Sequence, residues 1–185
     1  DPLRDVVYLH GFVERTQGEA TTQFKPQFAE DVTPAEEAKA FGRAWVYLTD
    51  RDKDSTVYYY SKYERTAYLK LARKYPEVCS SDDVEALFKL PEMVDLYTDV
   101  VMRCTEWPLY DRSIKTIAQY LGFNWRDTHP SGAASIGWYR QWVETGDVAI
   151  RQRILDYNED DCLATGVVLD GVRALQATAA QKKAA

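Results

Sequence analysis

A helix with a carboxylate on its apolar side is the feature that most constrains this chain. Within residues 150–169, apolar side chains recur at steps of three and four, at Ile150, Ile154, Tyr157, Ala164 and Val168. This spacing predicts an amphipathic helix whose apolar side packs against the rest of the protein. Asp161 falls on that same side, where an ionised carboxylate is strongly unfavourable unless it is paired or coordinates a metal. The rest of the chain must therefore supply a partner for Asp161.

The neighbouring acids of this helix, Asp156, Glu159 and Asp160, are expected on its other sides. Burial beside other acids disfavours the charged form of a carboxylate, so the pKa of Asp161 is expected to be raised. A plainer alternative is open, because a Tyr followed one turn later by an Asp also occurs on ordinary helices as a core Tyr and a surface acid.

Composition indicates one soluble globular domain over residues 1–185, because 45% hydrophobic and 28% charged residues are typical of such domains. No apolar run is long enough to span a membrane and no leader precedes Asp1, so we expect a cytoplasmic setting without membrane contact. Three widely spaced cysteines, Cys79, Cys104 and Cys162, argue against a disulfide framework.

The formal net charge of −6 argues against a protein that coats nucleic acid through a basic surface. A nucleic-acid enzyme is still compatible with this charge. A site that binds divalent cations through carboxylates is acidic, and the bound ions meet the phosphate.

The first part of the chain reads as two strands, over residues 5–14 and 23–29, joined by a hairpin connection that contains Gly18. Thr33 then begins a helix that runs to about residue 49, with Pro34 in its first turn. Residues 56–61, TVYYYS, are the most strand-like segment of the chain.

The remaining chain is predicted to be mostly helical. Helices are predicted over residues 63–75, 80–90, 113–122 and 134–144, and residues 93–103 read as a strand that passes into a helix. Strands first and helices after them indicate an α/β fold with a mixed β-sheet flanked by helices.

Three acids share a kind of position in this arrangement. Glu64 follows a strand in the first turn of a helix, Asp95 lies near a strand end, and Asp161 lies on a buried helix face. Sites in open α/β sheets lie beyond strand ends, so we expect the three to converge. Convergent carboxylates suit Mg²⁺ or Mn²⁺. For Glu64 alone, a first-turn acid favoured by the helix dipole is the competing interpretation.

Several stretches carry a resemblance to a known group of nucleases. YNEDDCLAT, at residues 157–165, resembles the third motif of DEDD-type exonucleases in their Tyr variant, within the ribonuclease H-like superfamily. That motif, together with YYYSKYERTAYLKLA, VDLYTDVV and SIKTIAQYLGF, is similar to the ribonuclease H-like nuclease domain of predicted RecB-family nucleases. The resemblance covers most of the chain and implies a ribonuclease H-like fold.

The resemblance implies roles for individual residues. Asp161 matches a metal-binding Asp, and Tyr157 matches a Tyr that orients the attacking water. Glu64 stands where the family has an Asp in its second motif, and Asp95 matches an acid that either supports the site or coordinates metal. The implied activity is 3′–5′ exonuclease hydrolysis of DNA with two Mg²⁺ or Mn²⁺ ions. The implied partners are a DNA 3′ end and a fused or associated helicase or second nuclease domain.

The largest departure from the family concerns its first motif, an Asp-x-Glu on the first and central strand. In this chain the Asp-x-Glu at residues 83–85 falls in a predicted short helix, and none lies on a predicted strand. We therefore expect the sheet to lack its first strand in this chain, and the chain by itself to be inactive.

Two further residues are candidates for nucleic-acid binding. Lys115 could contact a phosphate, although a solvated helix face is the alternative, and Asn158 lies beside Tyr157 in the third motif. Trp138, Tyr139 and Trp142 could stack on unpaired bases or belong to the core. A different class of function is also open, namely a non-catalytic nuclease-like module that binds nucleic acid or a partner domain.

Overall fold

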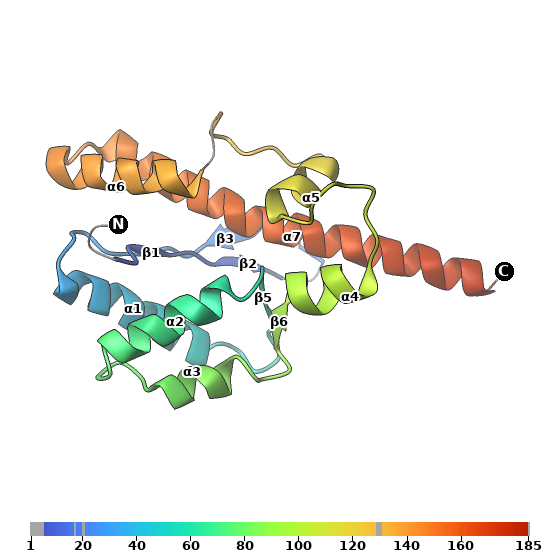
Figure 1. Cartoon of the computed structure of the whole chain (residues 1–185), viewed down its shortest axis with the longest axis horizontal. Coiled ribbons are helices and arrows are strands. Elements are labelled where there is room, and N and C mark those ends of the chain that lie inside the picture. The colour runs from blue at the N-terminus through green and yellow to red at the C-terminus, as the bar shows by residue number, and fades with distance from the viewer. Residues whose placement is uncertain (1–5, 17, 20, 129–130, 185) are drawn as a thin grey trace.

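Strands lie between two groups of helices in the computed structural model, which describes residues 6–16, 18–19, 21–128 and 131–184. The longest helix, α7 (Val148–Ala184), runs along the whole molecule with α6 (Gly132–Thr145) and α5 (Ile114–Tyr120) beside it, and α1 (Pro34–Thr49), α2 (Tyr63–Lys74) and α3 (Ser81–Leu87) lie on the other side of the strands (Figure 1). The layered α/β prediction is confirmed at this level.

The N-terminal strands form the predicted antiparallel hairpin, but each is divided in two. β1 (Leu9–His10) pairs with β4 (Gln27–Phe28), and β2 (Val13–Arg15) pairs with β3 (Thr22–Phe24). Pro26 lies at one interruption, where a residue without an N–H cannot donate to a strand ladder. Asp5, the first residue of the predicted strand, lies outside the described residues.

A parallel pair forms the second part of the β-structure. β5 (Val57–Tyr59) pairs with β6 (Met93–Asp95), and Tyr59 lies opposite Asp95. Among the described residues, no strand pairing joins this pair to the hairpin, so the ladders are separate instead of one continuous mixed sheet. Phe12 from the hairpin and Val57 from β5 nevertheless pack on one core cluster.

Helix ends follow the predicted capping chemistry. The Thr33 hydroxyl accepts from the Glu36 amide at the start of α1, and Ser80 and Asp83 form a reciprocal capping box at α3. The Asp-x-Glu at residues 83–85 is therefore helical, as expected. β6 passes into a π-helical turn (η1, Leu96–Val101) and a short helix, α4 (Met102–Cys104).

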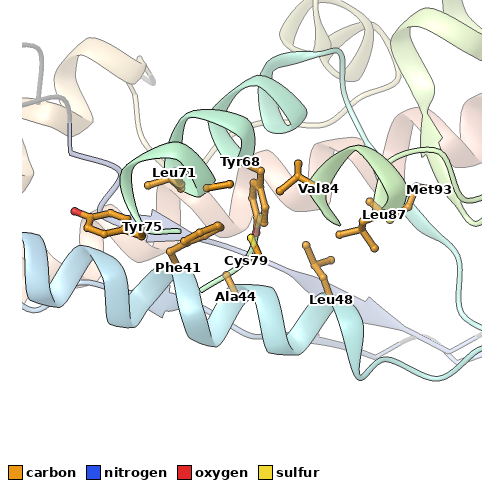
Figure 2. Packing of buried hydrophobic residues seen from close by; sticks show 11 residues of the cluster. Phe41, Ala44, Leu48, Tyr68, Leu71, Tyr75, Cys79, Val84, Leu87 and Met93 are labelled. Atoms are coloured by element: carbon orange, nitrogen blue, oxygen red, sulfur yellow. The ribbon is translucent and has the colours of Figure 1, made fainter. Parts of the chain in front are cut away.

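Buried side chains form clusters on both sides of the strands. One cluster joins α1, α2 and α3 to the strands (Figure 2). A second joins α5 to α7 through residues such as Ile117 and Val168, and a third joins the hairpin to α6 and α7 through Phe28 and Tyr139. The helix α7 therefore borders two clusters and is covered on more than one side.

Within the described part of the chain, no helix combines the length and apolar character needed to cross a bilayer.

A buried carboxylate connects the first cluster to the segment that precedes β1. Glu37 of α1 is fully buried and accepts hydrogen bonds from the Val7 amide at 2.7 Å, the Lys74 ammonium at 2.6 Å and the Tyr75 hydroxyl at 2.6 Å. Three donors from two distant parts of the chain therefore meet at one side chain.

Replacing Glu37 by Ala should lower the free energy of unfolding by about 3–5 kcal/mol, because it removes the acceptor of the buried Tyr75 hydroxyl and of the Val7 amide. Urea denaturation measures the change. The control is Arg103→Ala, which removes an exposed pair with Asp99 and should change stability by about 0.5 kcal/mol or less. Equal effects of the two substitutions would contradict the role of Glu37.

Candidate active site

Asp161 lies on the apolar side of α7, as predicted, and its partners come from both α7 and a distant loop. Its Oδ1 accepts a 2.8 Å hydrogen bond from the indole N–H of Trp125, and the Tyr157 side chain one turn earlier interacts electrostatically with the carboxylate. Asp161 is partly buried, and burial raises the pKa of its carboxyl group above the ordinary value. The prediction of a raised pKa is confirmed.

Lys115 reaches the same place from α5. Its ammonium lies 5.4 Å from the ring centroid of Tyr157 and 5.8 Å from that of Trp125, and its charge acts to lower the pKa of Asp161. Lys115 is half-buried instead of lying on a solvated helix face. Its position brings a positive charge to the Tyr157–Asp161 pair.

Glu64 lies in the first turn of α2, directly after β5 and its turn. Its Oε2 atom is buried and has no hydrogen-bond partner. Burial, followed by the charge of Asp95, raises the pKa of Glu64 to about 7. A carboxyl group of this kind is half-protonated near neutral pH and is available to a cation.

Asp95 ends β6 and supports the turn that carries Glu64. Its Oδ1 accepts the amide of Thr98 at 2.9 Å, as the cap of η1, and the amide of Ser61 at 3.0 Å. Ser61 has a φ of 81°, an unusual conformation for a residue other than glycine. Asp95 therefore fixes the strained turn between β5 and α2. This agrees with the expected role of supporting the site, the alternative to which was metal coordination.

Of the three predicted acids, Glu64 and Asp95 interact directly, whereas the interactions of Asp161 are with other residues. The charge of Asp95 acts on the Glu64 carboxyl group. Burial, and then the charges of Asp161 and Glu64, raise the pKa of the Cys162 thiol to about 12. Among the described residues, however, no three His, Cys, Asp or Glu side chains lie close enough together to hold a metal ion. The predicted three-carboxylate metal centre is thus not assembled by these residues alone.

Asn158, a predicted nucleic-acid contact, faces the hairpin. Its Oδ1 is buried without a hydrogen-bond partner, and a Cβ built on Gly11 would lie 1.7 Å from that atom. The close approach of α7 requires a glycine at position 11, between β1 and β2. Binding of nucleic acid by Asn158 stays a prediction.

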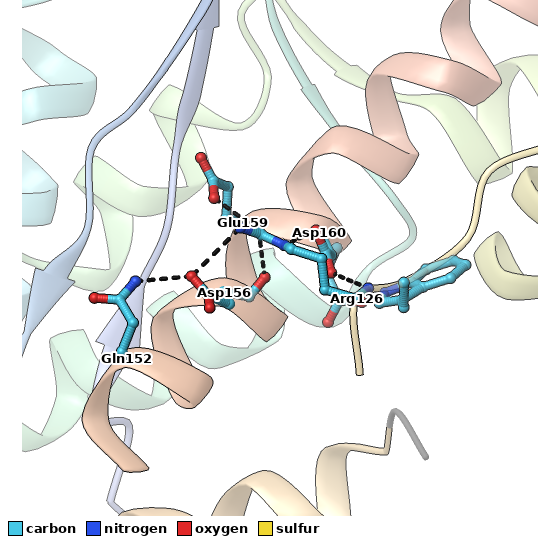
Figure 3. Close-up of polar contacts among 7 residues, drawn as sticks. Arg126, Gln152, Asp156, Glu159 and Asp160 are labelled. Carbon is cyan, nitrogen blue, oxygen red and sulfur yellow. Dashed lines mark hydrogen bonds and ion pairs between the residues drawn. The ribbon is translucent and has the colours of Figure 1, made fainter. Parts of the chain in front are cut away.

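The prediction that Asp160 lies on an outer side of α7 is wrong. Asp160 is 3% exposed and accepts from both the amide of Arg126 at 2.7 Å and its Nε at 2.8 Å. The Arg126 guanidinium also contacts Asp156 and Glu159 (Figure 3). The periodicity of α7 could not reveal this, because the covering segment is an irregular loop that comes from a distant part of the sequence.

The aromatic side chains of α6 divide between core and site. Tyr139 is fully buried and stacks on Tyr8, and Trp142 is 8% exposed, so both are core residues instead of base-stacking candidates. Trp138 is partly buried and meets the Tyr157 ring edge-on, with a centroid distance of 5.9 Å. Trp138 therefore packs against the Tyr157 ring, and Trp125 belongs to the same buried cluster.

In metal-free protein, Glu64→Gln should raise the free energy of unfolding at pH 8 by up to about 3 kcal/mol, because the folded state no longer holds a carboxylate with a raised pKa. The unfolded chain releases this proton at lower pH than the folded protein does, so wild-type stability falls as pH rises from about 4.5 to about 7. The gain in the variant should therefore vanish towards pH 4, in urea titrations across pH. A gain that does not depend on pH would contradict the assignment.

Gly11→Ala should destabilise the protein by about 1–3 kcal/mol through a clash with Asn158. In the double variant Gly11→Ala/Asn158→Ala, most of this loss should disappear, because the opposing side chain is gone. Thermal unfolding of the four proteins of the cycle measures the coupling. Additive effects would show that the two residues do not press on each other.

Comparisons with known proteins assign this chain to a family. The family model RNase_H_2, described as RNase_H superfamily, matches residues 1–172. The match includes Glu64, Asp95, Lys115, Tyr157 and Asp161. Searches of curated proteins and of solved structures found no match. Because the family model covers nearly the whole chain, the chain belongs to the RNase H superfamily.

Proposed function

We propose that this domain is a metal-dependent nuclease that hydrolyses phosphodiester bonds of DNA as a 3′–5′ exonuclease of the DEDD type, in the Tyr variant. The observation that carries the proposal is the Tyr157–Asp161 pair, one turn apart on α7, with Lys115 over the tyrosine ring. Membership of the RNase H superfamily supports a nuclease-like activity.

The donor types at this site fit Mg²⁺ or Mn²⁺. Both ions take oxygen ligands, and the unpartnered Oε2 of Glu64 is a buried oxygen whose isolation a cation would relieve. Glu64 and Asp161 would hold the ions, with Asp95 supporting Glu64 from below. When bound, such ions lower the pKa of a coordinated water and stabilise negative charge on the phosphate oxygens.

The protein's own residues would orient the reactants. The Tyr157 hydroxyl, whose pKa the charge of Asp161 helps to raise, would hydrogen-bond a water molecule next to that carboxylate. Lys115, next to Tyr157 and Asp161, would contact a substrate phosphate through its ammonium group. Asn158 is proposed as a weaker contact, since its side chain faces Gly11.

Further ligands are needed, because the described residues bring no three donors together. We propose that an Asp-x-Glu motif supplies them from a strand placed between the hairpin and β5. Two observations support this: the hairpin and the β5–β6 pair share a core cluster without hydrogen-bonding to each other. The resemblance to RecB-family nucleases would further place the domain beside a helicase or second nuclease domain at DNA 3′ ends.

A second candidate function is a non-catalytic module that binds nucleic acid or a partner domain. The absence of a three-donor metal group among the described residues favours it. The two candidates differ in one measurable property, which is metal-dependent cleavage by a chain that includes the Asp-x-Glu strand.

The 185-residue chain should bind Mn²⁺ weakly and leave DNA intact, whereas a chain extended at its N-terminal side through an Asp-x-Glu strand should degrade single-stranded DNA from its 3′ end with Mn²⁺. In the extended chain, Asp161→Ala should abolish cleavage, and Tyr157→Phe should lower kcat by roughly 10–100-fold, as expected for loss of a water-orienting group. Gel assays with 5′-labelled and 3′-labelled strands measure rate and polarity.

The matched control is Asp170→Asn, which alters an exposed acid of the same helix paired with Arg15 and should leave kcat unchanged. No cleavage by the extended chain would favour the non-catalytic module. Robust cleavage by the 185-residue chain would show that its own residues complete the site.

A further inference from the structure

A three-residue loop segment, Trp125–Asp127, attaches to α7 through each of its side chains in turn. The Trp125 indole donates to Asp161 and the Arg126 guanidinium donates to Asp160, while Asp127 accepts from Arg153 Nε at 2.6 Å. As the residue number rises from 125 to 127 in the loop, the partner's number falls from 161 to 153 in α7. The segment therefore lies antiparallel to α7. One of these contacts ends on the proposed site residue, and the other two do not.

Arg126 makes the most contacts of the three. Its amide and Nε bind the two oxygens of Asp160, Nη1 contacts Asp156 at 3.3 Å, and Nη2 donates to the Asp156 carbonyl at 2.8 Å and to Glu159 at 2.7 Å (Figure 3). Every nitrogen of the guanidinium is therefore engaged with α7. This distinguishes Arg126 from a residue whose guanidinium is open to a phosphate.

The buried carboxylate of Asp160 makes this attachment necessary for the stability of the fold. Its side chain is 4% exposed, and a buried carboxylate that lost its arginine would be strongly destabilised. The backbone amide and Nε of Arg126 bind different oxygens of Asp160, so the two contacts together fix both the side chain and the backbone of Arg126 against α7. With Arg126 fixed, the adjacent Trp125 has little freedom to leave Asp161.

We propose that Arg126 is a positioning residue, which holds the Trp125 indole on Oδ1 of Asp161 and so sets the direction of the remaining Asp161 oxygen. The importance of that direction for catalysis rests on the proposed function, whereas the attachment itself does not. Metal ligands need fixed orientation, and their outer hydrogen-bond partners supply it.

The test measures hydrogen exchange of tryptophan indole N–H groups by ¹H–¹⁵N NMR, with the Trp125 signal assigned through Trp125→Phe. Arg126→Ala should accelerate exchange at Trp125 by roughly tenfold or more, the change expected from losing a charge-assisted anchor. The Trp107 indole, bonded to the Thr105 hydroxyl at 2.7 Å, is the internal reference and should keep its rate.

Two variants sharpen the comparison. Arg126→Lys keeps the charge and loses the planar fork, so Trp125 should exchange at an intermediate rate. Arg15→Ala removes another two-point arginine contact to α7, with Asp170 at 2.6 and 2.8 Å, and should leave Trp125 unchanged. Equal acceleration at Trp125 and Trp107 in Arg126→Ala would indicate general destabilisation and overturn the proposal, as would unchanged exchange at Trp125.

An activity measurement separates this inference from the proposed function. In a nuclease-active, N-terminally extended chain, Arg126→Ala should lower kcat by roughly tenfold or more with KM little changed, because orientation and not substrate binding is lost. Unchanged kcat would overturn the positioning role. Selective loss of Trp125 protection in a protein that never cleaves DNA would leave the attachment standing and reject the proposed function instead.

Discussion

The burial of Asp160 on α7, together with the partial burial of Asp161 beside it, is the constraint on which the rest of the structure depends. Asp160 and Asp161 point into protein, and neither is stable there without donors. Trp125 and Arg126 supply these donors from a loop, and Lys115 adds positive charge from α5. The same packing of α5 and the loop against α7 thus stabilises the carboxylates of Asp160 and Asp161.

Sequence periodicity predicted the part of this arrangement that is local. The apolar side of α7, with Ile154, Tyr157 and Val168 buried, follows directly from the 3.6-residue repeat. The burial of Asp160 does not, because its partner lies 34 residues away in an irregular segment. Periodicity reports one buried side, whereas α7 is covered on more than one. Long-range polar pairs of this kind have no signature in either partner's own sequence neighbourhood.

The same distinction applies to the candidate site and the sheet. Strand-to-helix junctions placed Glu64 and Asp95 correctly, because the end of each element is encoded by adjacent residues. Which acids then approach one another depends on strand pairing, and here the hairpin and the β5–β6 pair remain separate ladders. The resemblance indicated the RNase H superfamily, which the family model confirms, whereas its finer assignment to DEDD-type nucleases of the RecB family stays a prediction. The metal geometry could not follow from the resemblance.

The raised pKa values of Glu64 and Asp161 connect the stability of the fold with the proposed binding of cations. Burial raises the pKa of both Glu64 and Asp161, so the metal-free fold is destabilised wherever these groups are ionised. The strained Ser61 turn adds a local conformational cost beside Glu64. A bound divalent cation would favour the ionised forms of both carboxylates and would stabilise the folded state by mass action. The buried Oε2 of Glu64, which has no hydrogen-bond partner, is therefore the feature that agrees best with the cation-binding role that we propose.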